Sequence, residues 1–180
     1  DRALRYIRQV ADALAYVHGQ GLLHLDIKPA NVMFNGRGEV VLIDFGVSKH
    51  YDEGGFQTSS AAIGTSEGYA PLEQYMSGCI STFSPSTDIY SLGATLYNLV
   101  TGQVPPHASV IDDNGLPVFA EGYSAYIYGI IEKAMKLVTI FARNEDEVIK
   151  MFEQIEKLDY LKSLGIGLLW ISPVYVSPCA

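Results

Sequence analysis

Four side chains near the start of the chain could act together in one reaction. Asp26, Lys28 and Asn31 lie within the stretch HLDIKPAN, and Asp44 lies in the sequence IDFG that follows. Mg²⁺ prefers hard oxygen ligands and usually takes one or two carboxylates together with phosphate oxygens, so Asn31 and Asp44 are a suitable pair. Each residue also has a structural alternative: Asp26 as a loop acid, Asn31 as a backbone partner and Asp44 as the cap of a turn.

The surrounding sequence predicts a helix and a ribbon that would position these side chains. Apolar residues recur at helical spacing over residues 3–18, and two glycines then end the pattern. Two short apolar runs, residues 32–34 and 40–43, flank NGRG, which suits the tight turn of a two-stranded ribbon. Such a ribbon would hold Asn31 close to Asp44.

The rest of the chain alternates loops with helical patterns. Residues 47–68 are rich in Gly, Ser and Thr and predict a long exposed loop. A second helix, apolar on much of its circumference, is predicted between residues 89 and 100 and is expected to be central and buried. Beyond it we expect a polar turn at residues 112–115, helices over 124–136 and 145–164, and a buried strand over 166–176.

The two motifs resemble the HRDxxxxN and DFG signatures of the protein kinase family. The resemblance implies that Asp26 receives the proton of a substrate hydroxyl and that Lys28 stabilises the charge of the bound phosphate. It also implies that Asn31 and Asp44 hold Mg²⁺ with ATP. A lysine two residues after the acid is similar to the arrangement in serine/threonine kinases, so Ser and Thr of a protein substrate are the expected acceptors.

Further residues take supporting roles in the same resemblance. His24 would be structural and would pack beneath Phe45 of the DFG motif, which Gly46 completes. Met33 would contact the adenine of ATP from below, or would pack as an ordinary aliphatic core residue. His24 is not expected to transfer a proton.

Two downstream segments extend the resemblance. GTSEGYAPLEQY resembles the end of the kinase activation segment, in which Thr65 would contact the catalytic loop. Glu73 would fill the position of the Glu in the APE motif, with Leu72 in place of the motif's Pro. SPSTDIYSLGATLYNLVTG resembles the central helix of the large lobe, and Asp88 matches the buried acid that bonds the backbone of the catalytic loop. The alternative for Asp88 is an acid that complements a helix dipole.

Three departures limit the resemblance. Leu25 replaces the Arg that many kinases pair with a phosphorylated activation loop, so Thr58, Ser59 and Ser60 are expected to be solvated hydroxyls rather than switch sites. The sequence has no GxGxxG loop and no VAIK-type strand, so we expect the small lobe to be absent and the chain alone to be weak or inactive. The third departure is the C-terminal segment.

The C-terminal sequence KLDYLKSLGIGLLWISPVYVSP resembles an early helix and strand of the α-amylase family of glycoside hydrolases. It contains none of the catalytic carboxylates that glycosidases require, and ordinary packing of a helix on a strand is an equal explanation. The expected organisation is a kinase-like large lobe over residues 1–136, a junction helix over 137–156 and a helix–strand segment over 157–180.

Composition excludes several classes of partner. A formal net charge of −8 argues against nonspecific attraction to nucleic acid or to anionic membranes. The two cysteines are far apart in the sequence and suggest neither a disulfide framework nor a zinc site. Apolar runs are too short to span a membrane, and the opening DRALRYI reads as cut from a longer chain. A cytoplasmic location is expected.

The expected fold is therefore mainly α: a kinase-like large lobe with a small β ribbon and a C-terminal helix–strand extension. The expected function is ATP-dependent phosphoryl transfer to Ser or Thr of a protein. The alternatives are a noncatalytic docking module and, more remotely, a fragment of a glycoside hydrolase. A cleft left uncovered by a missing small lobe would expose apolar surface and favour self-association.

Overall fold

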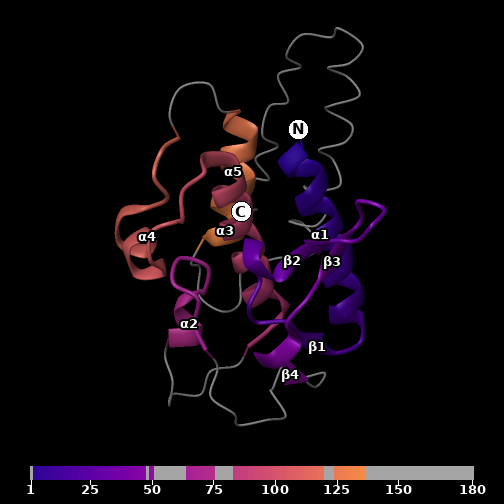
Figure 1. The fold of residues 1–180 in the computed structure, drawn as a ribbon. Coiled ribbons are helices and arrows are strands. Elements are labelled where there is room, and N and C mark those ends of the chain that lie inside the picture. Colours follow the sequence, from indigo (N-terminus) through magenta and orange to yellow (C-terminus); the bar gives the residue numbers. More distant parts are fainter. Residues whose placement is uncertain (1, 48, 51–63, 76–82, 120–123, 137–180) are drawn as a thin grey trace, which may run out of the picture.

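The computed structural model describes residues 2–47, 49–50, 64–75, 83–119 and 124–136. The helix expected over residues 145–164, the strand expected over 166–176 and the three loop hydroxyls of residues 58–60 lie outside these ranges. The described elements are α1 (Arg2–Gly19), β1 (Leu22–Leu23), β2 (Val32–Phe34), β3 (Val40–Leu42), β4 (Lys49–His50), α2 (Leu72–Tyr75), α3 (Pro85–Thr101), α4 (Ala108–Asn114) and α5 (Ala125–Met135) (Figure 1). The described part is thus mostly helical, as expected.

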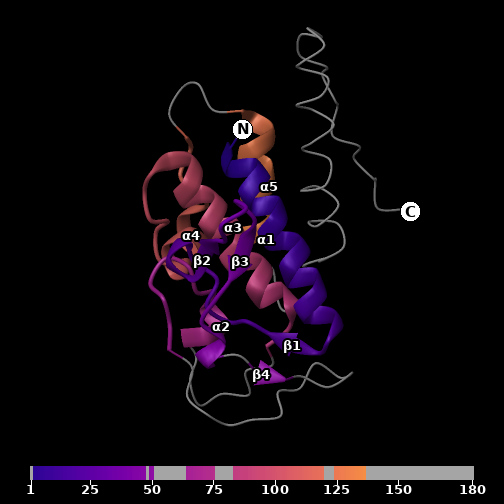
Figure 2. The ribbon, with the colours of Figure 1, turned by 45° about the vertical axis from the view of Figure 1, so that its right-hand side comes forward.

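Helix α1 forms where the apolar spacing predicted it and buries one face. Its buried residues are Leu4, Ile7, Val10, Ala11, Leu14 and His18. This face packs on α3, beside which α1 lies in Figure 2. The opposite face, which includes Asp12 and Tyr16, is exposed. The chain continues from this helix into β1 and then to His24.

Helix α3 is the centre of the core, in agreement with its apolar circumference. It begins with a capping box, in which the Ser84 side chain accepts from the backbone of Thr87 and the Thr87 hydroxyl accepts from the backbone of Ser84. It ends at Gly102, whose φ of 71° lies in the left-handed region that glycine adopts without strain. Because every residue from Thr87 to Tyr97 is buried, α3 can pack against α1 and α5 at once.

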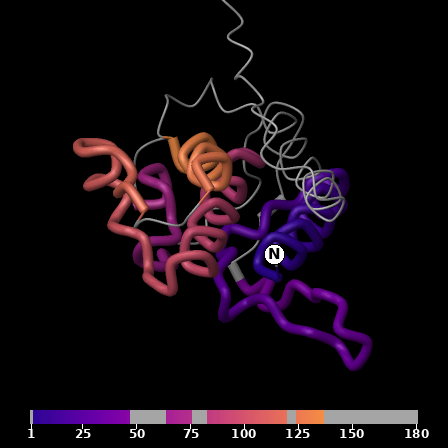
Figure 3. The backbone as a smooth tube through the Cα atoms, turned by 90° about the horizontal axis from the view of Figure 1, so that it is seen from above, coloured from indigo at the N-terminus to yellow at the C-terminus, as the bar shows by residue number. Residues whose placement is uncertain are grey.

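Strands β2 and β3 form the predicted antiparallel ribbon. Val32 pairs with Leu42, and Phe34 pairs with Val40. In the turn between them, the Asn35 carboxamide oxygen accepts the backbone N–H groups of Arg37 and Glu39 at 2.9 and 3.0 Å. Figure 3 shows this ribbon extending away from the helices.

Two local predictions were wrong. Residues 49–50, placed in a loop by composition, form strand β4, which pairs antiparallel with β1. The polar turn expected at residues 112–115 is instead the last turn of α4 followed by Gly115. Helix α4 forms there because the His107 side chain caps its first turn and Ile111 is buried, while the polar residues Asp112 and Asp113 are exposed on its surface.

No helix in the described part of the chain is both long and apolar enough to cross a membrane.

Candidate active site

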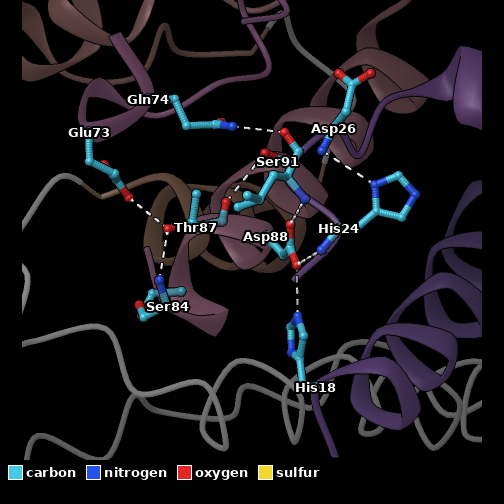
Figure 4. Close-up of polar contacts among 11 residues, drawn as sticks. His18, His24, Asp26, Glu73, Gln74, Ser84, Thr87, Asp88 and Ser91 are labelled. Atoms are coloured by element: carbon cyan, nitrogen blue, oxygen red, sulfur yellow. Dashed lines mark hydrogen bonds and ion pairs between the residues drawn. The ribbon is translucent and has the colours of Figure 1, made fainter. Parts of the chain in front are cut away.

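Asp88 is the buried acid around which the site is built. Its Oδ1 accepts the backbone N–H of Leu25 at 2.7 Å, and its Oδ2 accepts the backbone N–H of His24 at 2.8 Å (Figure 4). The Nε2 of His18, at the end of α1, lies 2.8 Å from the same Oδ2. The expected bonds between Asp88 and the backbone are therefore present, and they join α1, α3 and the loop that precedes Asp26.

Leu25 adopts a conformation that its neighbours must hold in place. Its φ is 65°, in the left-handed region that costs a non-glycine residue about 1–3 kcal/mol. Its N–H is bonded to Asp88, and its carbonyl accepts the side chain of Gln74 at 2.8 Å. The Leu25 side chain packs in a buried apolar cluster with Leu23 and Phe83. The position where many kinases have an Arg is therefore part of the core.

The carboxylate of Asp26 is bonded on both oxygens. Its Oδ1 accepts the hydroxyl of Ser66 at 2.6 Å, and its Oδ2 accepts the amide of Asn31 at 2.8 Å. The Nζ of Lys28 lies 2.8 Å from Oδ2 and also donates to the Ser66 hydroxyl at 2.9 Å. Asp26, Lys28, Asn31 and Ser66 thus form one network, which we call the Asp26 network.

The residue of this segment that bonds the Asp26 network is Ser66, the neighbour of the expected Thr65. The Ser66 carbonyl accepts the backbone N–H groups of Tyr69 and Ala70, so a turn begins at Ser66. The Ser66 side chain thus lies against the loop that contains Asp26, whereas the Thr65 side chain is exposed. Both residues carry a hydroxyl, and no local signal in the sequence separates them.

Asn31 and Asp44 lie at the same end of the β2–β3 ribbon. The backbone N–H of Ile43 donates to the carbonyl of Asn31 at 3.0 Å, which places Asp44 beside this pair. Both N–H groups of the Asn31 amide are used by Asp26, one by its carbonyl and one by its carboxylate, so the amide oxygen remains for a metal ion. Asp44 has a φ of 62° and is exposed.

Asn31 and Asp44 are better suited to Mg²⁺ than to a metal ion whose ligands all come from protein side chains. Within the described ranges, no group of three or more His, Cys, Asp or Glu side chains could hold a metal ion. Mg²⁺ commonly uses few protein ligands and completes its shell with waters and nucleotide phosphates, which one carboxylate and one amide oxygen allow.

His24 has the geometry of a neutral structural histidine. Its Nδ1 accepts the backbone N–H of Asp26 at 3.3 Å, so its Nε2 carries the proton and donates to the carbonyl of Ile43 at 3.1 Å. Its ring centroid lies 4.6 Å from that of Phe45, which is the contact expected from the sequence. His24 thereby joins the loop before Asp26 to the residues around Asp44.

Met33 and Gly46 are both exposed. Met33 is 53% exposed on β2, so the alternative of core packing was wrong and the side chain is available to a ligand. Gly46 is also exposed, and its backbone N–H donates to the carboxylate of Asp44 at 3.3 Å. A Cβ at position 46 would lie 3.0 Å from the Asp44 Oδ1, so that side chain would have to shift slightly to accept one.

Glu73 connects α2 to the beginning of α3. Its Oε1 accepts the hydroxyl of Thr87 at 3.2 Å, and that hydroxyl accepts the backbone N–H of Ser84 at 3.4 Å (Figure 4). A negative charge near the N-terminus of a helix is stabilising. In the same segment, burial and the nearby charge of Glu67 raise the pKa of Tyr75 above its ordinary value of 10.0.

The chain belongs to the protein kinase family. The sequence pattern of the protein kinase domain matches residues 1–162. This match runs through residues 137–156 and into the first residues of the segment that resembles an α-amylase. Both of those segments lie outside the described residues, so the proposed division at residue 136 and the resemblance of the tail stay predictions.

Curated relatives are serine/threonine kinases of bacteria and a plant kinase. The chain is 34% identical to serine/threonine-protein kinase PknB of Mycobacterium tuberculosis over 146 residues, which cover 74% of this chain and 23% of the relative. It is 37% identical to PknJ of the same organism over 108 residues, covering 58% of this chain and 18% of PknJ. It is 41% identical to MAP3K epsilon protein kinase 2 of Arabidopsis thaliana over 102 residues, covering 57% and 7% respectively. The chain spans less than a quarter of the length of these proteins.

Proposed function

We propose that this chain forms the large lobe of a serine/threonine protein kinase, which transfers the γ-phosphoryl group of ATP to a Ser or Thr hydroxyl of a protein. The observation that carries this proposal is the Asp26 network. It joins an acid, a lysine and an amide from HLDIKPAN in one network with Ser66, which lies 40 residues beyond Asp26 in the chain and bonds both Asp26 and Lys28. An isolated motif match would not predict this contact.

In the proposed reaction, Asp26 orients the substrate hydroxyl and accepts its proton as the oxygen attacks phosphorus. Lys28, which already lies beside the Asp26 carboxylate, stabilises the negative charge on the transferred group. Asn31 and Asp44 would hold Mg²⁺, which neutralises phosphate charge when it is bound with ATP. Met33, exposed on the ribbon, would contact the adenine.

The part of the site that covers the phosphates is proposed to come from a small lobe outside this sequence. The ribbon supports this proposal because the apolar side chains of Met33, Phe34 and Val41 are 53, 48 and 41% exposed. Such surface on an isolated lobe would favour self-association. Because positioning supplies much of the rate in phosphoryl transfer, we expect this chain alone to be weakly active.

The test is phosphorylation of casein by the purified chain with Mg²⁺ and radiolabelled ATP. We expect slow incorporation that falls by about 100- to 10,000-fold in Asp26→Asn, because the variant lacks the general base. Asp12→Asn is the matched control, since Asp12 is an exposed acid on α1, and it should retain the rate of the parent chain.

Three results would contradict the proposal. Equal activity in the parent chain and Asp26→Asn would show that the label comes from another enzyme. A folded chain that binds a protein partner but transfers no phosphate would support the noncatalytic docking module instead. Turnover of an oligosaccharide would favour the glycoside hydrolase alternative.

A further inference from the structure

The side-chain amide of Asn35, in the exposed turn between β2 and β3, is bonded through both its oxygen and its nitrogen. Its Oδ1 accepts the backbone N–H groups of Arg37 and Glu39 at 2.9 and 3.0 Å. Its Nδ2 donates to the Glu39 carboxylate at 2.6 Å, a short bond to a charged acceptor. The amide carbon of Asn35 therefore lies between two donors on its oxygen and a carboxylate on its nitrogen.

The residue after Asn35 leaves this amide open to attack by the backbone. Gly36 is exposed and has no side chain, and even a Cβ at its position would meet no atom within 4 Å. Within the described part of the chain, no acceptor takes the Gly36 N–H. The second Asn–Gly pair, Asn114 and Gly115, differs because the Gly115 N–H donates to the carbonyl of Ile111 at 2.8 Å where α4 ends.

We propose that Asn35 is a self-modifying site, at which the asparagine becomes aspartate or isoaspartate with water as the co-reactant. The Gly36 nitrogen attacks Cγ of Asn35, and the new N–Cγ bond closes a five-membered imide ring. The Cγ–Nδ2 bond breaks, and ammonia leaves. Water then adds to one of the two ring carbonyls and breaks its bond to nitrogen, so that –NH₂ has been exchanged for –OH. This inference does not depend on the proposed kinase function.

The contacts of the Asn35 amide supply the catalysis that this reaction needs. Negative charge develops on Oδ1 as the nitrogen attacks, and the N–H groups of Arg37 and Glu39 already point at that oxygen. The Glu39 carboxylate lies 2.6 Å from Nδ2. It receives the proton of the attacking Gly36 nitrogen and passes it to the departing ammonia.

The amide of Asn114 lacks this arrangement. Its Nδ2 donates to the carbonyl of Val110 at 3.2 Å, and a peptide carbonyl is far too weak a base to carry a proton between two nitrogens. The nitrogen that would attack, that of Gly115, is already engaged as the cap of α4. The two pairs thus share a sequence and an exposed position but differ in the contacts that assist the reaction.

Modification at residue 35 changes the end of the ribbon. The product places a carboxylate opposite Glu39, so an attractive contact becomes a repulsion between like charges across the turn. The isoaspartate product also lengthens the backbone of the turn by one methylene group. Modification should therefore weaken the pairing of β2 with β3, which holds Asn31 beside Asp44.

A purely structural role for Asn35 makes the opposite prediction. In that case the hydrogen bonds of the amide would only pin the turn and would protect it, so Asn35 would be modified more slowly than Asn114. Because both pairs are present in every molecule, their relative rates in one sample separate the two roles.

The experiment incubates the full 180-residue chain in ¹⁸O-labelled water at mildly alkaline pH, followed by site-resolved mass spectrometry of both Asn–Gly pairs. Each conversion incorporates one ¹⁸O. We expect Asn35 to convert at least about tenfold faster than Asn114 in the folded chain. In concentrated urea the two rates should converge, because the contacts of the folded turn are lost.

Two variants test the chemistry. Gly36→Ala, for which the structure has room, should slow conversion at Asn35 by about tenfold because the added methyl group hinders the attacking nitrogen. Glu39→Gln keeps an acceptor for the Asn35 amide but cannot carry the proton, so it should also slow the reaction. The rate at Asn114 should be unchanged in both variants, which serves as the internal control.

Three results would overturn the inference. Equal rates at the two sites of the folded chain, or faster conversion of Asn114, would show that the turn gives no assistance. A rate at Asn35 that rises in urea would show that the folded turn protects the amide. An unchanged rate in Glu39→Gln would remove the proton transfer assigned to Glu39.

Discussion

Replacing Asp88 by Asn tests whether this acid organises the site through its hydrogen bonds. The carboxylate accepts backbone N–H groups of Leu25 on one oxygen and of His24 on the other. An Asn side chain keeps one acceptor oxygen, so its NH₂ group must face at least one of these buried donors. A buried donor left unsatisfied costs about 1–3 kcal/mol, and the remaining bonds lose their charge assistance.

We therefore expect Asp88→Asn to lower the free energy of unfolding by about 2–4 kcal/mol. For a domain of this size, each kcal/mol lowers the Tm by about 2–4 °C, so the expected fall is about 4–16 °C. The assay is a thermal melt followed by far-ultraviolet circular dichroism. Asp112→Asn is the control, because Asp112 is exposed on α4 and its replacement should change the Tm by less than about 2 °C.

A result within the range of the control would refute this reasoning. If Asp88→Asn melted at the temperature of the parent chain, the bonds from Asp88 to Leu25 and His24 would contribute little to stability. The strained backbone at Leu25, which has a φ of 65°, would then have to be held by other contacts, such as the bond from Gln74.

Three further predictions follow from other parts of the structure. Gly93→Ala should lower the free energy of unfolding, measured by urea titration, by about 1–3 kcal/mol, because a Cβ at position 93 would lie 2.7 Å from the Cβ of Ala134. The control is Gly129→Ala, which should stabilise α5 because a Cβ at position 129 would meet no atom within 4 Å. Burial raises the pKa of Tyr97 above its ordinary value of 10.0, so the stability from this group is complete below pH 10 and is lost as the pH rises through the higher folded value. Melts between pH 9 and 11 should show this decline, and Tyr97→Phe should reduce it. Asp44→Ala should abolish any rise in Tm produced by millimolar Mg²⁺·ATP, and an unchanged rise would exclude Asp44 as a metal ligand.

Much of the local structure could be predicted because it depends on residues close together in the sequence. The spacing of apolar residues in α1, α3 and α5 indicates whether a helix buries one face or its whole circumference. The turn-forming residues of NGRG predict the ribbon. Composition was a poorer guide for β4, which forms through pairing with β1 from another part of the chain. It also failed at the end of α4, where burial of Ile111 and the His107 cap outweigh the polar residues that follow.

The family and the candidate chemical groups could be recognised from the sequence, because Asp26, Lys28 and Asn31 occur within six residues at a characteristic spacing. The contacts that those groups make depend on tertiary packing. Asp88 reaches the backbone of Leu25 from 63 residues away, and Ser66 rather than Thr65 reaches Asp26 from 40 residues away. Such contacts depend on how α3 packs and where a turn begins, and neither leaves a periodic signal in the local sequence.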